Sequence, residues 1–176
     1  MSTVVPPPLG LGRPSRKSIQ YRLVVIQHPT RARCCGFGEK DKRPINPPPI
    51  LQLHVTNSDG LLTPTDNVSH LIVQCDLFSA DRKDNRNVVY NPASINPAYP
   101  NSNAAGAFCL RFRFIDLTAG EPLTMSTQVL HEVFSDPFSV YSAKNFPGMT
   151  GTTPLSLCFS KQGIKISVRK SPGSKR

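Results

Sequence analysis

The residues with the clearest capacity for chemistry are five basic side chains in one short stretch, residues 30–49. They are Arg31, Arg33, Lys40, Lys42 and Arg43. Arginine offers paired donors to a phosphate or to the O6 and N7 atoms of guanine, and lysine offers a compact positive charge. Gly36 and Gly38 lie in the same stretch and allow the backbone to approach a ligand closely. The pattern favours a polyanion-binding loop; a solvated loop with offsetting charges is the alternative.

A second basic group lies near the C-terminus and contains Lys165, Arg169 and Lys170. We expect it to extend the same surface. The net charge is +10, and residues 1–22, 31–43 and 161–176 hold 15 of the 21 basic residues but only 2 of the 11 acids. Such segregation is typical of a protein that binds a polyanion. Basic ends that aid solubility or nuclear import would not explain the internal stretch.

The sequence offers no catalytic constellation. The run 36–40 (GFGEK) lacks the GxxxxGK[ST] spacing of a phosphate loop, and no GxSxG, HExxH or DxDxG motif occurs. The acids are scattered, so no acid–base pair is evident. The five cysteines form no CxxC pair and the four histidines are dispersed, so we expect no metal site, no cofactor and no enzyme activity. Cys75, Cys109 and Cys158 are predicted to be small core residues in a reducing compartment.

The elements that must position the basic residues are predicted to be strands. Eighteen prolines leave little room for long helices. Short β-prone runs predict strands over residues 21–27, 50–55, 71–77, 88–90, 108–117, 127–133, 138–141 and 164–168. One helix is predicted over residues 154–162, capped by Thr153 and ended by Gly163. We therefore expect an all-β, two-sheet antiparallel sandwich with long loops and one short helix near the C-terminus, with a barrel as the alternative.

The strongest strand signal lies in residues 108–117. Apolar side chains at even positions from 108 to 114 alternate with Arg111 and Arg113. The period of two predicts a buried aromatic face and an exposed arginine face. We expect the two arginines to pair with Asp116 or Glu121, a structural role that is favoured over ligand binding.

The two ends of the chain differ from its middle. Residues 1–18 are rich in proline and serine, carry basic residues and predict a disordered leader, and residues 171–176 form a basic tail. The folded domain is predicted over residues 19–170. The longest apolar runs are a few residues, far below the roughly 20 that span a bilayer, so no membrane contact is expected.

Three runs of sequence carry a resemblance to a known family. They are ARCCGFGEKDKRPINPPPILQL at 32–53, LRFRFIDL at 110–117 and VYSAKNFPGMTGTTPLSLCFSKQGIKISVRK at 140–170. In this order they resemble the opening, central and closing motifs of the fungal velvet domain. The resemblance covers about residues 19–170. The sequence GFGEKD at 36–41 and the short domain are most similar to the spore-viability, VosA-like branch.

The resemblance implies a fold like the immunoglobulin-like DNA-binding domain of Rel/NF-κB factors. It also implies a dimeric, sequence-specific, DNA-binding transcription regulator that acts in the nucleus, with shuttling from the cytoplasm left open. Such a protein would control fungal development, sporulation and secondary metabolism. Carried over to this chain, the family's DNA contacts would come from the basic stretch identified above. The expected partners are double-stranded DNA and velvet-family proteins as homo- or heterodimer, with no small-molecule substrate. The alternative function is an adaptor that binds other velvet proteins and contacts DNA only weakly.

Overall fold

Seven strands and one helix make up the part of the chain that the computed structural model describes, which is residues 19–35, 42–57, 69–87, 105–117 and 127–169. In chain order they are β1 (Gln20–Gln27), β2 (Arg31–Arg33), β3 (Ile50–Thr56), β4 (Leu71–Ser79), β5 (Gly106–Asp116), β6 (Val129–Phe134), β7 (Phe138–Tyr141) and α1 (Pro154–Lys161). The predicted strand over residues 88–90, the leader and the basic tail lie outside these ranges.

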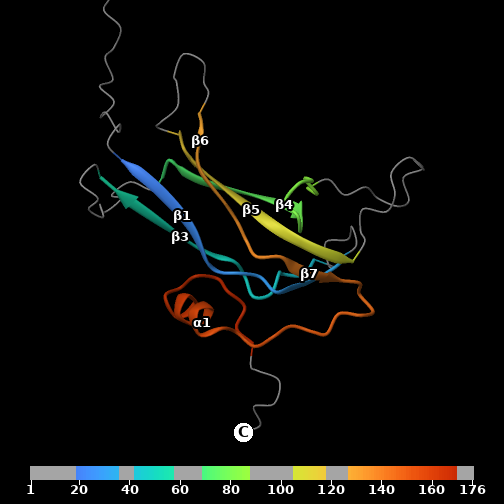
Figure 1. Cartoon of the computed structure of the whole chain (residues 1–176). Helices are drawn as coiled ribbons and strands as arrows, with labels where there is room; N and C mark the ends of the chain where they lie inside the picture. Colours follow the sequence, from blue (N-terminus) through green and yellow to red (C-terminus); the bar gives the residue numbers. More distant parts are fainter. Residues whose placement is uncertain (1–18, 36–41, 58–68, 88–104, 118–126, 170–176) are drawn as a thin grey trace, which may run out of the picture.

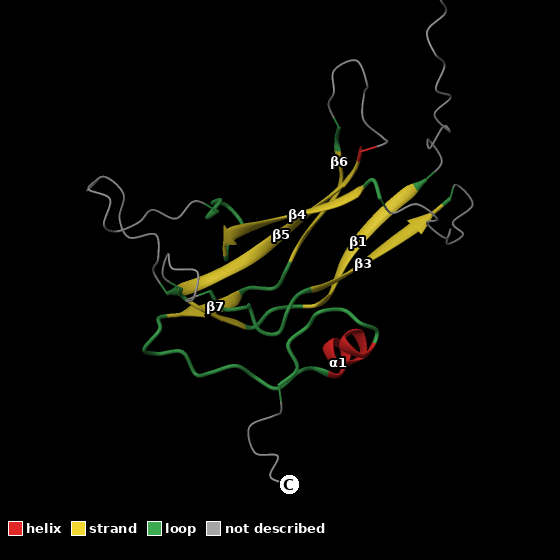
Figure 2. Ribbon diagram, turned by 180° about the vertical axis from the view of Figure 1, so that it is seen from behind, coloured by secondary structure: helices red, strands yellow, loops and turns green. Residues whose placement is uncertain are grey.

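The strands form two sheets (Figures 1 and 2). β1 and β3 pair antiparallel as a two-stranded sheet. The other five strands form the second sheet. Four of them follow the order β2-β7-β5-β4, and the fifth, β6, also pairs with β5. β2 and β7 are parallel, so this second sheet is mixed and not purely antiparallel as predicted. The predicted all-β sandwich with one short helix is otherwise confirmed.

The core forms where the inner faces of the two sheets meet. Leu23 and Val25 alternate with less buried neighbours along β1, which directs them to the same face. They pack with Phe112 and Phe114 of β5 in one buried cluster. Each large side chain buried in this way contributes roughly 1.5–3 kcal/mol. The predicted buried aromatic face of β5 is therefore confirmed.

The helix α1 begins and ends as its sequence predicts. The Thr153 hydroxyl accepts a hydrogen bond from the Ser156 backbone N–H at 3.1 Å, and Pro154 occupies the first turn, where no N–H partner is needed. Gly163 follows the helix with φ of +91°, a conformation that favours glycine, and its N–H donates to the Ser160 carbonyl. In Figure 1, α1 lies beyond the ends of β1 and β3.

Two predicted elements differ in the structure. Residues 31–33 are expected in a loop but form β2, because they pair with β7; three residues are too few to show an alternating pattern. Residues 164–168 are expected to form a strand but are not one. Ile164 and Val168 are exposed there, and no neighbouring strand covers them among the described residues.

The cysteine prediction is correct at one position only. Cys109 is fully buried, whereas Cys75 and Cys158 are exposed. Cys75 lies on β4, which ends the described part of its sheet, and Cys158 lies on the exposed side of α1. Although Cys75 is exposed by surface area, neighbouring protein atoms partly desolvate its thiol, and this desolvation together with the Asp76 carboxylate raises its pKa, so the thiol stays protonated at neutral pH.

Candidate nucleic-acid interface

β2 positions the first two candidate arginines. Ala32 is buried in the core, so Arg31 and Arg33 on either side of it turn to the opposite face and are half-buried. Parallel pairing sets Arg31 opposite Ser139 and Arg33 opposite Tyr141. The strand therefore presents two cations on one face, spaced by two residues.

The residue Asn46 joins β2 to the segment that carries Lys42 and Arg43. The Asn46 carbonyl accepts hydrogen bonds from the N–H groups of Thr30 and Arg31 at 3.0 and 2.9 Å, and its own N–H donates to the Arg31 carbonyl at 2.9 Å. Asn46 is itself 4% exposed. Lys42 and Arg43, both exposed, lie a few residues before this junction.

The C-terminal cations reach the same junction from the other end of the domain. Lys165 and Arg169 line a pocket of about 160 Å³ together with Asn46. The Arg169 N–H donates to the Thr152 hydroxyl at 2.6 Å, which fixes this segment beside the turn before α1. The Arg31 guanidinium donates to the carbonyl of Gly148, in the segment that leads to the same turn, at 3.5 Å.

A buried side-chain amide connects the segment around Asn46 with the start of α1. Gln27, the last residue of β1, is 9% exposed. Its amide nitrogen donates to the Pro48 carbonyl at 2.7 Å and to the Ser156 hydroxyl at 2.8 Å. Its amide oxygen accepts from the Thr153 hydroxyl at 2.6 Å. One side chain thus joins β1, the turn that follows the first basic segment and the start of α1.

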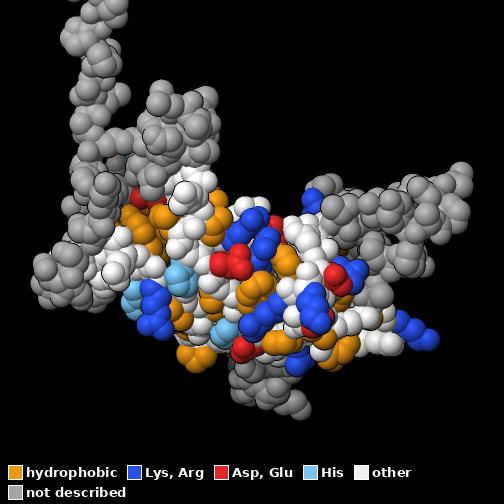
Figure 3. Space-filling view, turned by 45° about the horizontal axis from the view of Figure 1, so that its top comes forward, with side chains coloured by type: hydrophobic (Ala, Val, Ile, Leu, Met, Phe, Trp, Pro, Cys, Tyr) orange, Lys and Arg blue, Asp and Glu red, His pale blue; other side chains and the backbone are white. Residues whose placement is uncertain are grey.

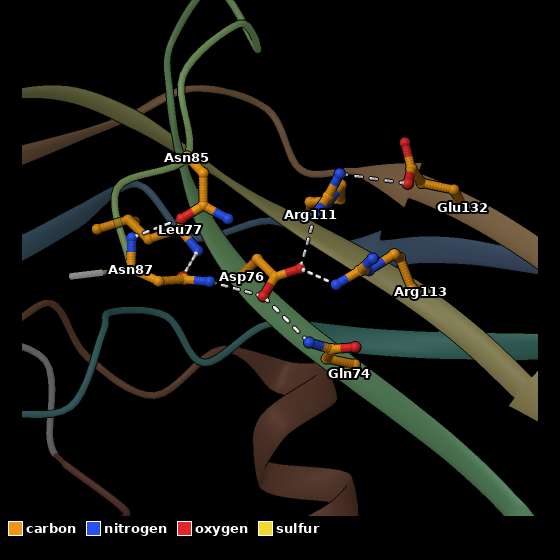
Figure 4. Close-up of polar contacts among 8 residues, drawn as sticks. All are labelled: Gln74, Asp76, Leu77, Asn85, Asn87, Arg111, Arg113 and Glu132. Carbon is orange, nitrogen blue, oxygen red and sulfur yellow. Dashed lines mark hydrogen bonds and ion pairs between the residues drawn. The ribbon is translucent and has the colours of Figure 1, made fainter. Parts of the chain in front are cut away.

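The arginines of β5 are occupied elsewhere (Figure 4). The Nη2 atoms of Arg111 and Arg113 each donate to Oδ2 of Asp76 at 3.0 Å. Asn87 donates to the other carboxylate oxygen at 2.7 Å. The Arg111 guanidinium also lies 4.2 Å from the centre of the Phe78 ring, a cation–π contact. These arginines therefore have a structural role within the sheet, as predicted.

The geometry corrects two details of that prediction. The acid that pairs with both arginines is Asp76 of β4; Asp116 is buried and accepts from the Tyr21 hydroxyl at 3.0 Å. Glu121 lies outside the described residues. The side chains of Arg111 and Arg113 are only 18% and 27% exposed, because the β4 and β6 side chains enclose them.

Asp76 has a pKa below its usual range. Burial is the largest single influence and opposes ionisation. The hydrogen bonds from Asn87 and Arg111, together with the charges of Arg113 and Arg111, outweigh it. The carboxylate is therefore charged at neutral pH and offsets the positive charge on this face. In the view of Figure 3, basic and acidic side chains are correspondingly intermixed.

The structure therefore brings three of the eight predicted site residues together at the Asn46 junction. Arg31, Lys165 and Arg169 surround the junction at Asn46, and Lys42 and Arg43 precede it in the chain. Arg33 lies at the other end of the short strand β2. Lys40 and Lys170 lie outside the described residues.

Three organising residues were missed from the sequence. Asp76 and Gln74 are two residues apart on β4 and therefore share a face of the strand. This signal would have placed Asp76 beside the arginines of β5, on the same face of the sheet. Gln27 and Asn46 gave no such signal, because the bonds that tie them to the segments around α1, to Ser156 and Thr150, span 129 and 104 residues of the chain. Among the described residues no group of three or more potential metal ligands occurs. None of the described helices is long and apolar enough to span a bilayer.

Comparison with known proteins identifies relatives of this chain. The family model described as Velvet factor matches residues 21–105 and 103–173. The sexual development regulator umv3 of Mycosarcoma maydis is 34% identical over 93% of this chain and 49% of its own length. The developmental and secondary metabolism regulator veA of Emericella nidulans is 30% identical over 97% of the chain and 40% of its own length.

Relatives named for other roles match at similar identity. The spore development regulator RYP2 of Ajellomyces capsulatus is 29% identical over 90% of the chain and 45% of its own length. The matches thus support the family as a whole and not one branch of it. The chain spans half or less of the length of these relatives. Since the family model covers nearly all of the predicted domain and identities reach 34% over almost the whole chain, this protein belongs to the velvet family.

Proposed function

We propose that this protein is a sequence-specific DNA-binding regulator of fungal development that acts in the nucleus. Its relatives are named as regulators of sexual development, of spore development, and of development and secondary metabolism. These roles come to the present chain as part of the proposal. Sporulation and secondary metabolism are the processes that it is expected to control.

One observation carries the DNA-binding part of the proposal. Cations from two segments more than a hundred residues apart in the chain gather at the Asn46 junction, where backbone and side-chain hydrogen bonds fix both segments. Lys42 and Arg43 are exposed on the approach to it. A cluster of this kind suits the phosphate backbone of DNA, which dominates affinity, and arginine adds the capacity to read guanine.

The charge elsewhere on the sheet supports the same assignment. Arg111 and Arg113 are engaged by one buried carboxylate, and Arg111 lies 3.7 Å from Glu132 as well. These cations are therefore poorly available to DNA. The cationic end at Asn46 differs because no acid is among the described residues that line its pocket.

A second candidate function, the dimerisation or adaptor module, is favoured by a different surface. Register aligns Ile72 of β4 with Ile115 of β5, and Ile115 with Val129 of β6, on one face of the sheet. Ile72 and Val129 are 41% and 45% exposed. An apolar row of this kind suits contact with another protein. We propose that the protein dimerises with itself or with another velvet protein, and the two functions are compatible.

Selection from a randomised pool of short DNA duplexes tests the proposed function. The purified chain is incubated with the pool at low and at near-physiological salt, and the bound DNA is sequenced. Enrichment of a short motif, with affinity that falls steeply with salt, is the expected result. Salt-dependent binding without enrichment would remove the claim of sequence specificity. Absence of binding at either salt would favour the adaptor function.

A further inference from the structure

The pocket at the Asn46 junction has a composition that the proposed DNA contact does not require. It lies between the turn before β3 and the segment after α1, and its volume is about 160 Å³. Two cationic side chains line it, Lys165 and Arg169. The other lining residues are prolines, isoleucines and small polar residues. This combination of charge and apolar surface points to a defined class of ligand.

The charge in the pocket is of one sign. No aspartate or glutamate is among the described residues that line it. Within the described part of the chain, neither Lys165 nor Arg169 forms an ion pair, and the hydrogen bonds of Arg169 come from its backbone. Both side chains therefore keep their donors for a ligand, and their charges favour an anion.

Part of the pocket lining is apolar. Ile45, Pro47, Pro48 and Ile166 form it, and none of their side chains can bond to a bare anion such as phosphate. An apolar cavity of about 150 Å³ is large enough to hold one benzene molecule. The pocket thus has room for a single ring or a branched aliphatic group beside an anionic head.

The walls of the pocket are bonded to one another and are therefore formed before a ligand arrives. The Asn46 side-chain amide donates to the Thr150 hydroxyl. The Thr152 N–H donates to the Arg169 carbonyl at 3.2 Å, and the Gln27 amide holds the Pro48 carbonyl from below. Ligand pockets are usually preformed in this way, with a few placed polar groups on an apolar lining.

We propose that this pocket binds a small organic anion with a ring-sized apolar body and a carboxylate or phosphate head. Lys165 and Arg169 would contact the head, and the proline and isoleucine side chains would cover the body. The proposal concerns binding of such an anion and no chemical step. The pocket uses Lys165 and Arg169, which the proposed DNA contact also includes, so it is tested without DNA and its outcome does not depend on whether the protein binds DNA.

A titration of the ¹⁵N-labelled full chain, without DNA, tests the proposal by NMR. Benzoate carries both ring and charge, benzamide carries the ring alone and acetate carries the charge alone. We expect benzoate to shift the amide signals of Ile45, Thr152 and Ile166 and to bind at least several-fold more tightly than either of the other two. Phenyl phosphate is titrated in parallel, and the tighter of the two aromatic anions identifies the preferred head.

Variants separate a built pocket from general charge attraction. Lys165→Ala and Arg169→Ala should each weaken benzoate binding by about threefold to fivefold, the effect of losing one partly exposed ion pair. Ile166→Phe, which keeps both cations but fills the pocket, should abolish it. Lys161→Ala removes an exposed cation from α1, outside the pocket lining, and should change nothing. Equal binding of acetate and benzoate, or equal weakening by Lys161→Ala, would overturn the proposal.

Discussion

At the scale of single residues, Asp76 is the buried acid that pairs with both arginines of β5. It is 4% exposed and accepts from Arg111, Arg113 and Asn87. Removing one member of a buried ion pair leaves the remaining charges without compensation, which costs more than the pair itself contributes. We therefore expect the residue to matter chiefly to the stability of the sheet.

The variant Asp76→Asn should lower the free energy of unfolding by about 2–3 kcal/mol, since both guanidinium groups lose their carboxylate but remain partly hydrated. Urea unfolding of the variant and the wild type at neutral pH measures this difference in the free energy of unfolding. Asp84→Asn is the matched control, because the Asp84–Arg86 pair is half-exposed on both sides and should contribute less than about 1 kcal/mol. Equal effects of the two substitutions would contradict the assigned role.

The depressed pKa of Asp76 makes this contribution depend on pH. Its folded-state pKa lies below the unfolded value of about 3.9, so the stabilisation is fully present above that pH and is lost as pH falls through the folded-state pKa. The stability gap between the wild type and Asp76→Asn should therefore be constant near neutrality and shrink in acid. Urea unfolding across this range measures the gap, and a gap that widened on acidification would refute the sign.

At the scale of elements, α1 is held by polar contacts more than by a hydrophobic face. Ser156 is its buried residue, and Thr153 both caps the helix and donates to Gln27. An eight-residue helix is too short to be stable alone, so these contacts decide whether it forms. The position of the C-terminal cations depends on the same contacts.

The variant Thr153→Ala should destabilise the protein by about 1–2 kcal/mol, because it removes the cap and leaves the Gln27 amide oxygen without its donor. Amide hydrogen exchange should be faster in α1 of this variant than in α1 of the wild type, with a smaller change in β5. Thr153→Ser keeps the hydroxyl and serves as the control. If Thr153→Ala exchanged at the wild-type rate in α1, the capping contact would not stabilise the helix.

The element scale also shows where sequence patterns suffice. Strands β1, β3, β4, β5, β6 and β7 and the helix follow from β-prone runs, alternation and capping signals that are local in the chain. β2 could not be predicted, because three residues carry no period and their strand character depends on β7, more than a hundred residues later. Residues 164–168 show the converse: they alternate as a strand would, but no described strand pairs with them.

At the scale of the whole molecule, positive charge is divided between two settings. On the arginine face of β5 it is partly offset by Asp76 and Glu132, whereas at the Asn46 junction it gathers without an acid in the pocket lining. Charge counting could predict which segments carry the excess of basic residues. It could not predict that the segments meet, since the meeting depends on Asn46 and Gln27, whose bonds are set by the fold.

The salt dependence of DNA binding tests the central claim most directly. Fluorescence anisotropy of a labelled duplex compares the wild type with Lys42→Glu/Arg43→Glu. The matched control is Lys83→Glu/Arg86→Glu, on the turn after β4, where both cations are at least half-exposed.

Each phosphate that the protein no longer neutralises reduces the slope of log K against log salt by about 0.9. We predict weaker binding and a slope shallower by about 2 for the first variant, with little change for the control. Wild-type affinity and slope in a folded Lys42→Glu/Arg43→Glu variant would contradict the claim that this end of the sandwich binds DNA.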